Sequence, residues 1–141
     1  NKNKIMKELT CTGVDGISNT FYFDKKDHDC DGSISITVWV KPQREGNSLE
    51  LLLVPFDSSS YRIQMITHNR KSEFKAKGIP DTLLPVVSQQ LKKRIISSRK
   101  RKITGCDEYR TDEADKMWDR LVEKGIAEYD NTTGRYSIAS F

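Results

Sequence analysis

Apolar and polar residues alternate without interruption over residues 33–40, and this pattern constrains the fold more than any other feature of the chain. One face of the segment carries Ile34, Ile36, Val38 and Val40, and the other carries Ser33, Ser35, Thr37 and Trp39. A period of two residues is typical of a β-strand with one buried face, because successive side chains point to opposite sides. The segment Ser33–Val40 is therefore predicted to be a half-buried strand.

Further strands are predicted on both sides of this segment. The same alternation recurs at Leu49, Leu51 and Leu53 and at Tyr61, Ile63 and Met65, while Thr20–Phe23 is a shorter aromatic candidate. The intervening segments are polar and rich in turn residues, as hairpin loops are, and comprise Asp24–Gly32, Lys41–Asn47 and Pro55–Ser59. The first part of the chain is thus predicted to form an antiparallel meander of about four strands.

A helix is predicted to follow the meander. Asp81 or Thr82 can cap its start, and Pro85 then falls in the first turn, where a missing N–H costs little. An apolar stripe at helical spacing continues to a predicted end near Ser97 and Ser98, and comprises Leu84, Val87, Leu91 and Ile95.

A second helix and a hairpin are predicted in the last third of the chain. Asp112 can cap the helix, and Gly125 suits a left-handed stop. The predicted buried stripe of this helix comprises Ala114, Trp118, Leu121 and Val122. Two short strands, Ile126–Tyr129 and Arg135–Ile138, flank a turn at Asp130–Gly134.

These elements predict an α+β fold, with a helix packed on the antiparallel meander and a helix plus β-hairpin after it. We divide the chain into a meander at residues 1–80 and a helical and hairpin portion at residues 81–141, with one core shared between them. Within the second portion, Trp118, Leu121 and Val122 precede the tripeptide Gly125–Ala127, and Gly134 and Tyr136 lie in the hairpin. In this order of residues, the segment 112–138 resembles the last helix and wing of a winged-helix domain, although no specific family is identified. The resemblance implies a helix that enters the DNA major groove and a wing that touches the backbone.

Positive charge is concentrated in the middle of the chain. Residues 62–102 hold twelve Lys and Arg against two acids, whereas residues 1–61 have a net charge of −2 and residues 103–141 of −4. Such a field attracts polyanions, so we predict contacts with a DNA or RNA backbone. The candidate binding residues are Lys92, Lys93, Arg94, Arg99, Lys100, Arg101 and Lys102. Cations at Arg62, Arg70, Lys71, Lys75 and Lys77 extend this patch if the hairpin end lies nearby.

Two other interpretations of the basic cluster stay open. Cations near a helix end complement the helix dipole, and Lys and Arg also keep surfaces solvated. The acidic flanks are also able to neutralise the cluster within the molecule or across a dimer. The predicted helix at 112–124 is acidic and would be repelled by phosphates, so a polyanion is expected to be gripped at the basic cluster instead.

The segment Asp27–Ser35 is similar to the first nine positions of an EF-hand calcium loop. The resemblance implies side-chain ligands at Asp27, Asp29 and Asp31, a carbonyl ligand at Ser33 and a water-mediated ligand at Ser35. Position twelve is Val38 rather than the expected Glu, and strands rather than helices are predicted on both sides. An acidic hairpin loop that ends in glycine explains the same residues, so calcium is the lesser alternative.

Catalytic motifs, long apolar runs and cysteine spacing indicate which broad class of function the chain belongs to. No catalytic motif stands out, so a non-enzymatic nucleic-acid-binding or regulatory accessory protein is predicted, with no cofactor. The alternative is a protein–protein interaction module or homo-oligomer with no nucleic-acid role. No apolar run approaches the roughly 20 residues of a membrane span, so no membrane role is expected. Three cysteines, an odd number without paired spacing, favour a reducing cytoplasm.

Overall fold

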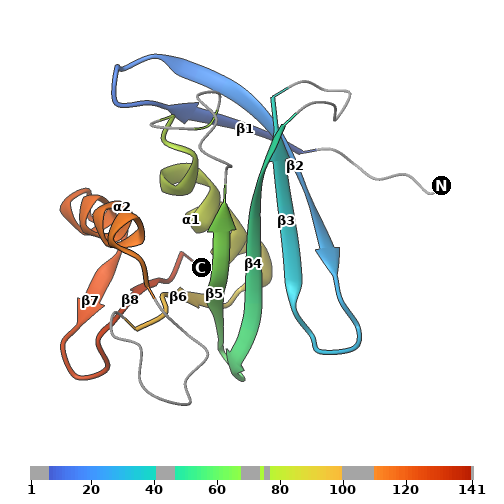
Figure 1. Ribbon diagram of the computed structural model, residues 1–141, viewed down its shortest axis with the longest axis vertical. Coiled ribbons are helices and arrows are strands. Elements are labelled where there is room, and N and C mark those ends of the chain that lie inside the picture. The colour runs from blue at the N-terminus through green and yellow to red at the C-terminus, as the bar shows by residue number, and fades with distance from the viewer. Residues whose placement is uncertain (1–6, 41–46, 68–73, 75–76, 100–109, 141) are drawn as a thin grey trace. The chain divides into compact units, whose positions relative to one another are not determined.

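The computed structural model describes residues 7–40, 47–67, 74, 77–99 and 110–140, and within these ranges the fold is α+β (Figure 1). The strands are β1 (Lys7–Thr12), β2 (Ser18–Asp27), β3 (Ile34–Trp39), β4 (Ser48–Asp57), β5 (Ser60–Thr67), β6 (Arg94–Ile96), β7 (Glu128–Asp130) and β8 (Arg135–Ile138). The helices are α1 (Ile79–Leu91) and α2 (Asp112–Glu123). The strand order in the sheet is β1-β2-β3-β4-β5-β6-β8-β7.

The chain divides into two compact units. Unit 1 comprises residues 1–54 and 65–83, and unit 2 comprises residues 55–64 and 84–141. The hairpin end at residues 55–64 therefore groups with the C-terminal part of the chain.

Unit 1 is built on the antiparallel strands that the alternation predicts. Phe23 is paired with Val38, and Val38 with Leu49, so one row of apolar side chains crosses three strands on the same face. Leu9 of β1 is paired with Phe21, two residues from Phe23, and so lies on the same face in a neighbouring row. The core residues on this face are all at most 3% exposed and comprise Leu9, Phe21, Phe23, Ile36, Val38, Leu49 and Leu51. The burial of this face supplies the main hydrophobic stabilisation of the unit.

Four details of unit 1 differ from the sequence prediction. Strand β1 was not expected, and β2 runs on to Asp27 through a segment that was predicted as a connection. Trp39 is 1% exposed although it lies on the face of the polar residues, because that face also carries aromatic side chains: Trp39 is paired with the half-buried Tyr22. Val40, which was assigned to the apolar face, lies beyond the end of β3 and is 38% exposed. Residues 41–46 of the predicted loop lie outside the described residues.

Helix α1 begins and ends earlier than predicted. It starts at Ile79, so Pro85 lies inside the helix rather than in its first turn. It ends at Leu91, where Lys92 takes a left-handed φ of 56°. The Ser88 hydroxyl donates to the carbonyl of Lys93 at 2.7 Å and helps to fix this end. The predicted end at Ser97–Ser98 is wrong: Ile95, which fits the helical spacing, lies in β6 instead.

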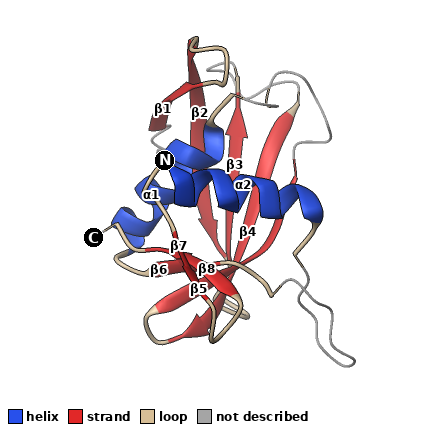
Figure 2. Cartoon of the chain, turned by 90° about the vertical axis from the view of Figure 1, so that its left-hand side faces the viewer, coloured by secondary structure: helices blue, strands red, loops and turns tan. Residues whose placement is uncertain are grey.

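Unit 2 contains the short strands β6, β7 and β8 and helix α2 (Figure 2), together with the end of β4, the first part of β5 and residues 84–91 of α1. β6 runs parallel to β5, with Ser60 opposite Arg94 and Arg62 opposite Ile96. Parallel strands need a crossover connection, and α1 lies in the segment that joins β5 to β6. On its other side β6 pairs antiparallel with β8, and β8 pairs with β7.

The helix and hairpin of unit 2 form close to where the sequence places them. The cap of α2 is Thr111, one residue before the predicted Asp112, and its side chain accepts from the backbone N–H of Ala114 at 3.1 Å. Gly125 takes a φ of +76°, as a left-handed stop requires. The Trp118 ring stacks on Tyr136 of β8, with centroids 5.6 Å apart, and this contact attaches the helix to the strands. Val122, predicted as buried, is 37% exposed, and Met117 takes its place at 9%.

Candidate nucleic-acid interface

The first cations of the predicted cluster lie at the junction between α1 and β6, all within unit 2. Lys92 is exposed and is the single non-glycine residue with positive φ in the described part of the chain. Lys93 extends to the turn between β4 and β5, where its ammonium group donates to the carbonyl of Ser58. Arg94 is the first residue of β6, and its backbone N–H donates to the carbonyl of Ser59 at 2.9 Å. The sequence predicts that these residues end the first helix. This prediction is wrong, because the helix ends at Leu91 and the chain then enters a strand.

The rest of the predicted cluster is separated from this junction by β6. Arg99 is half-buried and follows the strand, so the run of cations divides between the two ends of β6. Lys100, Arg101 and Lys102 lie outside the described residues, as do Arg70, Lys71 and Lys75 of the proposed extension. Lys77 is described and belongs to unit 1. Arg62 is the member of the extension that lies beside the cluster residues in unit 2.

Strand register places three arginines on one face of the β5-β6-β8 sheet. Arg62 is opposite Ile96, and Ile96 is opposite Ser137, so these three side chains project to the same side. Arg94 and Arg135 lie two residues from Ile96 and Ser137 along their strands, and a spacing of two keeps the side on which a side chain projects. We call this surface, comprising Arg62, Arg94 and Arg135, the arginine face. The opposite face of the same strands carries Tyr136, which packs on α2.

The dipeptide Ser97-Ser98 receives hydrogen bonds from three guanidinium groups. Arg62 donates to the Ser98 hydroxyl at 2.9 Å, and Arg135 donates to the Ser97 carbonyl at 2.9 Å. Arg110 donates to the Ser98 carbonyl at 2.8 Å and to the Ser97 hydroxyl at 3.3 Å. Both serines are buried, with exposures of 1% and 6%. Positive charge from three segments far apart in the sequence therefore converges on two neutral residues.

Only part of this charge is balanced by acidic side chains of the described residues. Arg110 is 6% exposed and forms an ion pair with Asp115 in the first turn of α2. Arg62 bonds instead to neutral groups, the Ser98 hydroxyl and the Gln64 side-chain oxygen at 2.8 Å. Arg94 contacts the Ser137 hydroxyl at 3.5 Å. Within the described ranges neither Arg62 nor Arg94 has a carboxylate partner, so no neighbouring carboxylate there offsets the positive field of these two guanidinium groups.

Hydrogen bonds to neutral groups orient these guanidinium groups without using all their donors. A guanidinium carries five N–H groups in a planar fork, which matches the oxygens of a phosphate. Arg62 uses one terminal nitrogen on Ser98 and the other on Gln64, and these two hydrogen bonds involve only two of its five N–H groups. The side chain is thus held in place before any ligand arrives, and this lowers the entropy lost on binding.

An exposed aromatic ring lies beside the arginine face. The guanidinium of Arg135 lies 4.7 Å from the ring centroid of Phe56, a residue near the end of β4 that belongs to unit 2. Phe56 is 48% exposed, so a large part of its ring faces solvent. Cation–π attraction holds the ring and the guanidinium together at the surface.

Helix α2 presents a different surface. Its twelve residues include five carboxylates and two cations, and Asp112, Glu113 and Asp119 are exposed. Asp119 accepts a hydrogen bond from the Tyr136 hydroxyl. Burial, and then this hydrogen bond, raise the pKa of Tyr136 to about 12. The acidic side of α2 therefore contributes to packing on β8 and does not add to the positive surface.

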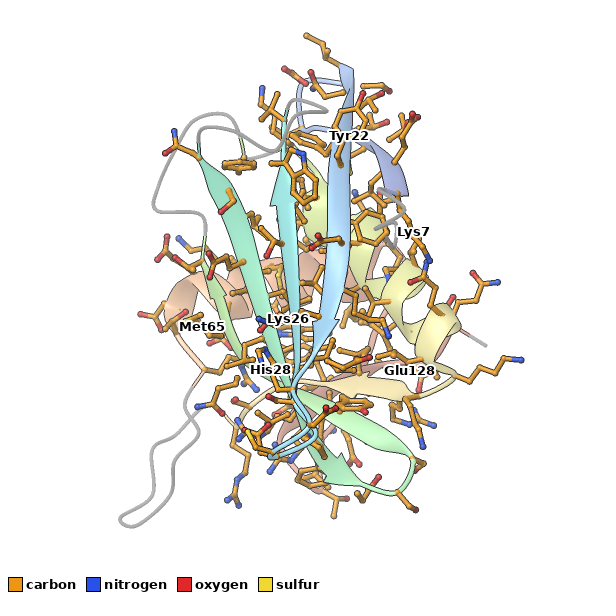
Figure 3. The ribbon with its side chains drawn as sticks, turned by 90° about the vertical axis from the view of Figure 1, so that its right-hand side faces the viewer. Lys7, Tyr22, Lys26, His28, Met65 and Glu128 are labelled. Atoms are coloured by element: carbon orange, nitrogen blue, oxygen red, sulfur yellow. The ribbon has the colours of Figure 1, made fainter. Side chains whose placement is uncertain are left out.

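The calcium alternative has no support in the loop geometry. The Asp31 carboxylate accepts from the backbone N–H of Ser33 at 3.0 Å and from its hydroxyl at 2.7 Å, which lowers the pKa of Asp31. Asp27 forms an ion pair with Lys25 at 3.4 Å. His28 lies just past the end of β2 (Figure 3), with its Nε2 atom 2.7 Å from the Ser35 hydroxyl. Among the described residues, which include Asp27, Asp29 and Asp31, no group of three or more His, Cys, Asp or Glu side chains is placed to hold a metal ion.

Sequence reasoning missed Arg110 and Arg135 because both lie in the acidic C-terminal third, outside the basic run. A signal for Arg135 was present nonetheless. It occupies a polar position of an alternating strand, Arg135–Ile138, just as Arg62 does between Tyr61 and Ile63. An arginine at such a position projects from the sheet face that the core leaves open. Arg110 has no comparable local signal, since its partners come from distant segments.

Two general findings complete the description. No helix in the described part of the chain is long and apolar enough to cross a membrane. Comparison with protein-family models, with curated proteins and with solved structures finds no match to this chain.

Proposed function

We propose that this protein is a non-enzymatic nucleic-acid-binding accessory protein that grips the phosphate backbone of DNA or RNA. The contact surface is the arginine face together with the cations of the α1–β6 junction. The observation that carries the proposal is the convergence of Arg62 and Arg135 on Ser97-Ser98, with Arg94 on the same face of the sheet. Phosphates that bind this face gain charge-assisted hydrogen bonds to the guanidinium groups, and the released counterions add a favourable entropy.

The location of these charges favours backbone gripping over base reading by α2. The resemblance of residues 112–138 to a helix and wing implies a helix in the major groove, but α2 carries more carboxylates than cations. Phosphates of a duplex would be repelled by the carboxylates of α2, whereas they would be attracted by the cations of the arginine face. The further helix that a winged-helix domain needs before α2 would fall at residues 100–109, outside the described residues.

The proposal is tested by the salt dependence of oligonucleotide binding. A triple variant, Arg62→Gln, Arg94→Gln and Arg135→Gln, removes three cations from the arginine face. We expect weaker binding and a slope of log K against log salt that is smaller by about two to three, since each lost phosphate contact contributes ~0.7 for single strands and ~0.9 for duplex. Fluorescence anisotropy of labelled DNA and RNA over a range of salt concentrations measures both quantities.

A matched control removes the same charge elsewhere. Lys25 and Lys26 of β2 and Lys116 of α2 are exposed cations that do not belong to the arginine face, and their replacement by glutamine lowers the net charge by the same amount. Circular dichroism and thermal melting establish that both triple variants fold. If the two variants lose equal affinity and slope, binding reflects net charge alone and the proposed surface is wrong. If the unaltered protein binds no oligonucleotide at low salt, the function itself is wrong.

A protein-interaction role is the second candidate, and one observation in unit 1 favours it. The turn between β1 and β2 exposes two branched aliphatic side chains, Val14 at 77% and Ile17 at 58%. Neighbouring exposed apolar residues are one signature of a protein contact. Sedimentation velocity of the unaltered protein and of Val14→Ser/Ile17→Ser distinguishes the roles. If the unaltered protein is a dimer and the double variant is a monomer, the result supports a homo-oligomer. If the unaltered protein is a monomer at high concentration, the homo-oligomer is excluded.

A further inference from the structure

We infer that the nucleic acid bound by the arginine face is single-stranded, with a base stacked on Phe56. This inference rests on the proposed function and names the class of ligand. Its observation is the contact between the exposed Phe56 ring and the guanidinium of Arg135, both within unit 2.

Phe56 holds an exposed ring against a residue of the arginine face. It lies one residue before the end of β4, in the part of that strand that belongs to unit 2. Arg135 reaches its ring from the arginine face, which places the ring at the border of that face. The ring is 48% exposed, so it keeps surface on which a ligand can stack.

The second step is the chemistry that this combination recognises. Proteins that bind single strands combine positively charged surfaces for the backbone with aromatic rings on which bases stack. A base inside a duplex is already stacked between its neighbours and does not offer a free face to a ring that lies on a sheet. The Arg135 guanidinium holds the ring in place from one side, so a base is able to stack on the remaining exposed surface.

The third step concerns the hydrogen-bonding groups between the charges. The Gln64 and Ser137 side chains contact the arginines and present amide and hydroxyl groups on the same face. Such groups bond the edges of unpaired bases or the phosphate oxygens with little sequence preference. The face therefore combines a phosphate site, a stacking site and neutral polar groups, which together suit an extended single strand.

The test compares two probes and three forms of the protein. The probes are a fluorescein-labelled oligothymidine of about 15 nucleotides, near the upper end of single-strand site sizes, and the same strand annealed to oligoadenosine. The proteins are the unaltered chain, Phe56→Ala and Phe56→Tyr. We expect the unaltered protein to bind the single strand more tightly, Phe56→Ala to lose about tenfold in that affinity, and Phe56→Tyr to retain it. Thermal melting checks that the exposed substitution leaves the fold intact.

Each outcome separates the inference from the proposed function. Tighter binding of the single strand, lost in Phe56→Ala and kept in Phe56→Tyr, supports both. Equal or tighter binding of the duplex, or an unchanged single-strand affinity in Phe56→Ala, overturns the inference. Either result leaves the proposed binding to the phosphate backbone in place. Binding of neither probe at low salt overturns the proposed function, and the inference with it.

Discussion

Replacement of Arg110 by methionine is expected to destabilise unit 2 strongly, because its guanidinium joins three segments of that unit. It forms the ion pair with Asp115 in α2 and bonds to the carbonyl of Ser98 after β6. It also donates to the carbonyl of Gly134 in the turn between β7 and β8 at 3.1 Å. The group lies 4.8 Å from the centroid of the Tyr136 ring as well. Methionine keeps much of the length and apolar contact of the side chain but supplies no donor.

The magnitude follows from what the substitution leaves behind. Removing one partner of a buried ion pair costs about 3–5 kcal/mol when the other charge stays buried. Asp115 keeps 22% of its side-chain surface exposed and can regain water, which favours the lower end. Loss of the donor to the buried Ser98 carbonyl adds on the order of 1 kcal/mol. We therefore expect the free energy of unfolding to fall by about 4 kcal/mol, a large share of the ~5–15 kcal/mol typical of a domain.

The assay is urea denaturation of Arg110→Met, Asp115→Ala and the double variant, followed by circular dichroism. The two losses should be non-additive, with a coupling energy of about 1.5–3 kcal/mol, because each single variant leaves the other group without its partner. Glu113→Ala, an exposed acid in the same helical turn, serves as the control and should cost less than about 0.5 kcal/mol. A loss below about 1 kcal/mol for Arg110→Met, or additive losses in the cycle, would refute the anchoring role.

Two further predictions concern other parts of the fold. At Gly78, φ is +76° and a Cβ atom would lie 2.1 Å from the backbone oxygen of Thr12, so Gly78→Ala should lower the free energy of unfolding by about 3 kcal/mol, measured by urea denaturation. No measurable loss would contradict the close approach of these two segments. Because burial and Asp119 raise the pKa of Tyr136 to about 12 in the folded state, the unfolded tyrosine ionises first, and stability should fall as pH rises from about 10 to about 12. Tyr136→Phe should show a shallower decline in melting temperature over that window, and an identical decline would contradict the shifted pKa.

The arginine face illustrates why the candidate site was only partly predictable. A local count of charge identified Lys92–Lys102 as basic, since counting needs no knowledge of contacts. The same count assigned Arg110 and Arg135 to an acidic segment, although hydrogen bonds bring both of them to Ser97-Ser98. Pairing of β6 with β5 on one side and with β8 on the other creates the face, and none of these pairings is local in sequence.

The sequence by itself determined the parts of the fold whose signals are local. Alternation placed β3 and most of β4, because a strand with one buried face requires a period of two. Gly125 and Gly134 marked the end of α2 and of the hairpin turn, since both positions have positive φ, which glycine adopts at little cost. These features depend on the conformational preferences of a few neighbouring residues.

Only the tertiary structure decided where α1 gives way to β6. Leu91 and Ile95 are four residues apart, a spacing that fits a helix, and the sequence alone therefore extended the helix too far. In the folded chain Ile95 is fully buried in β6, opposite Tyr61 of β5 and Ile138 of β8. Hydrogen bonds and burial against two distant strands outweigh the small difference in local propensity at these residues. The same long-range pairing sets the basic residues on one sheet face, and with them the surface that we propose as the nucleic-acid interface.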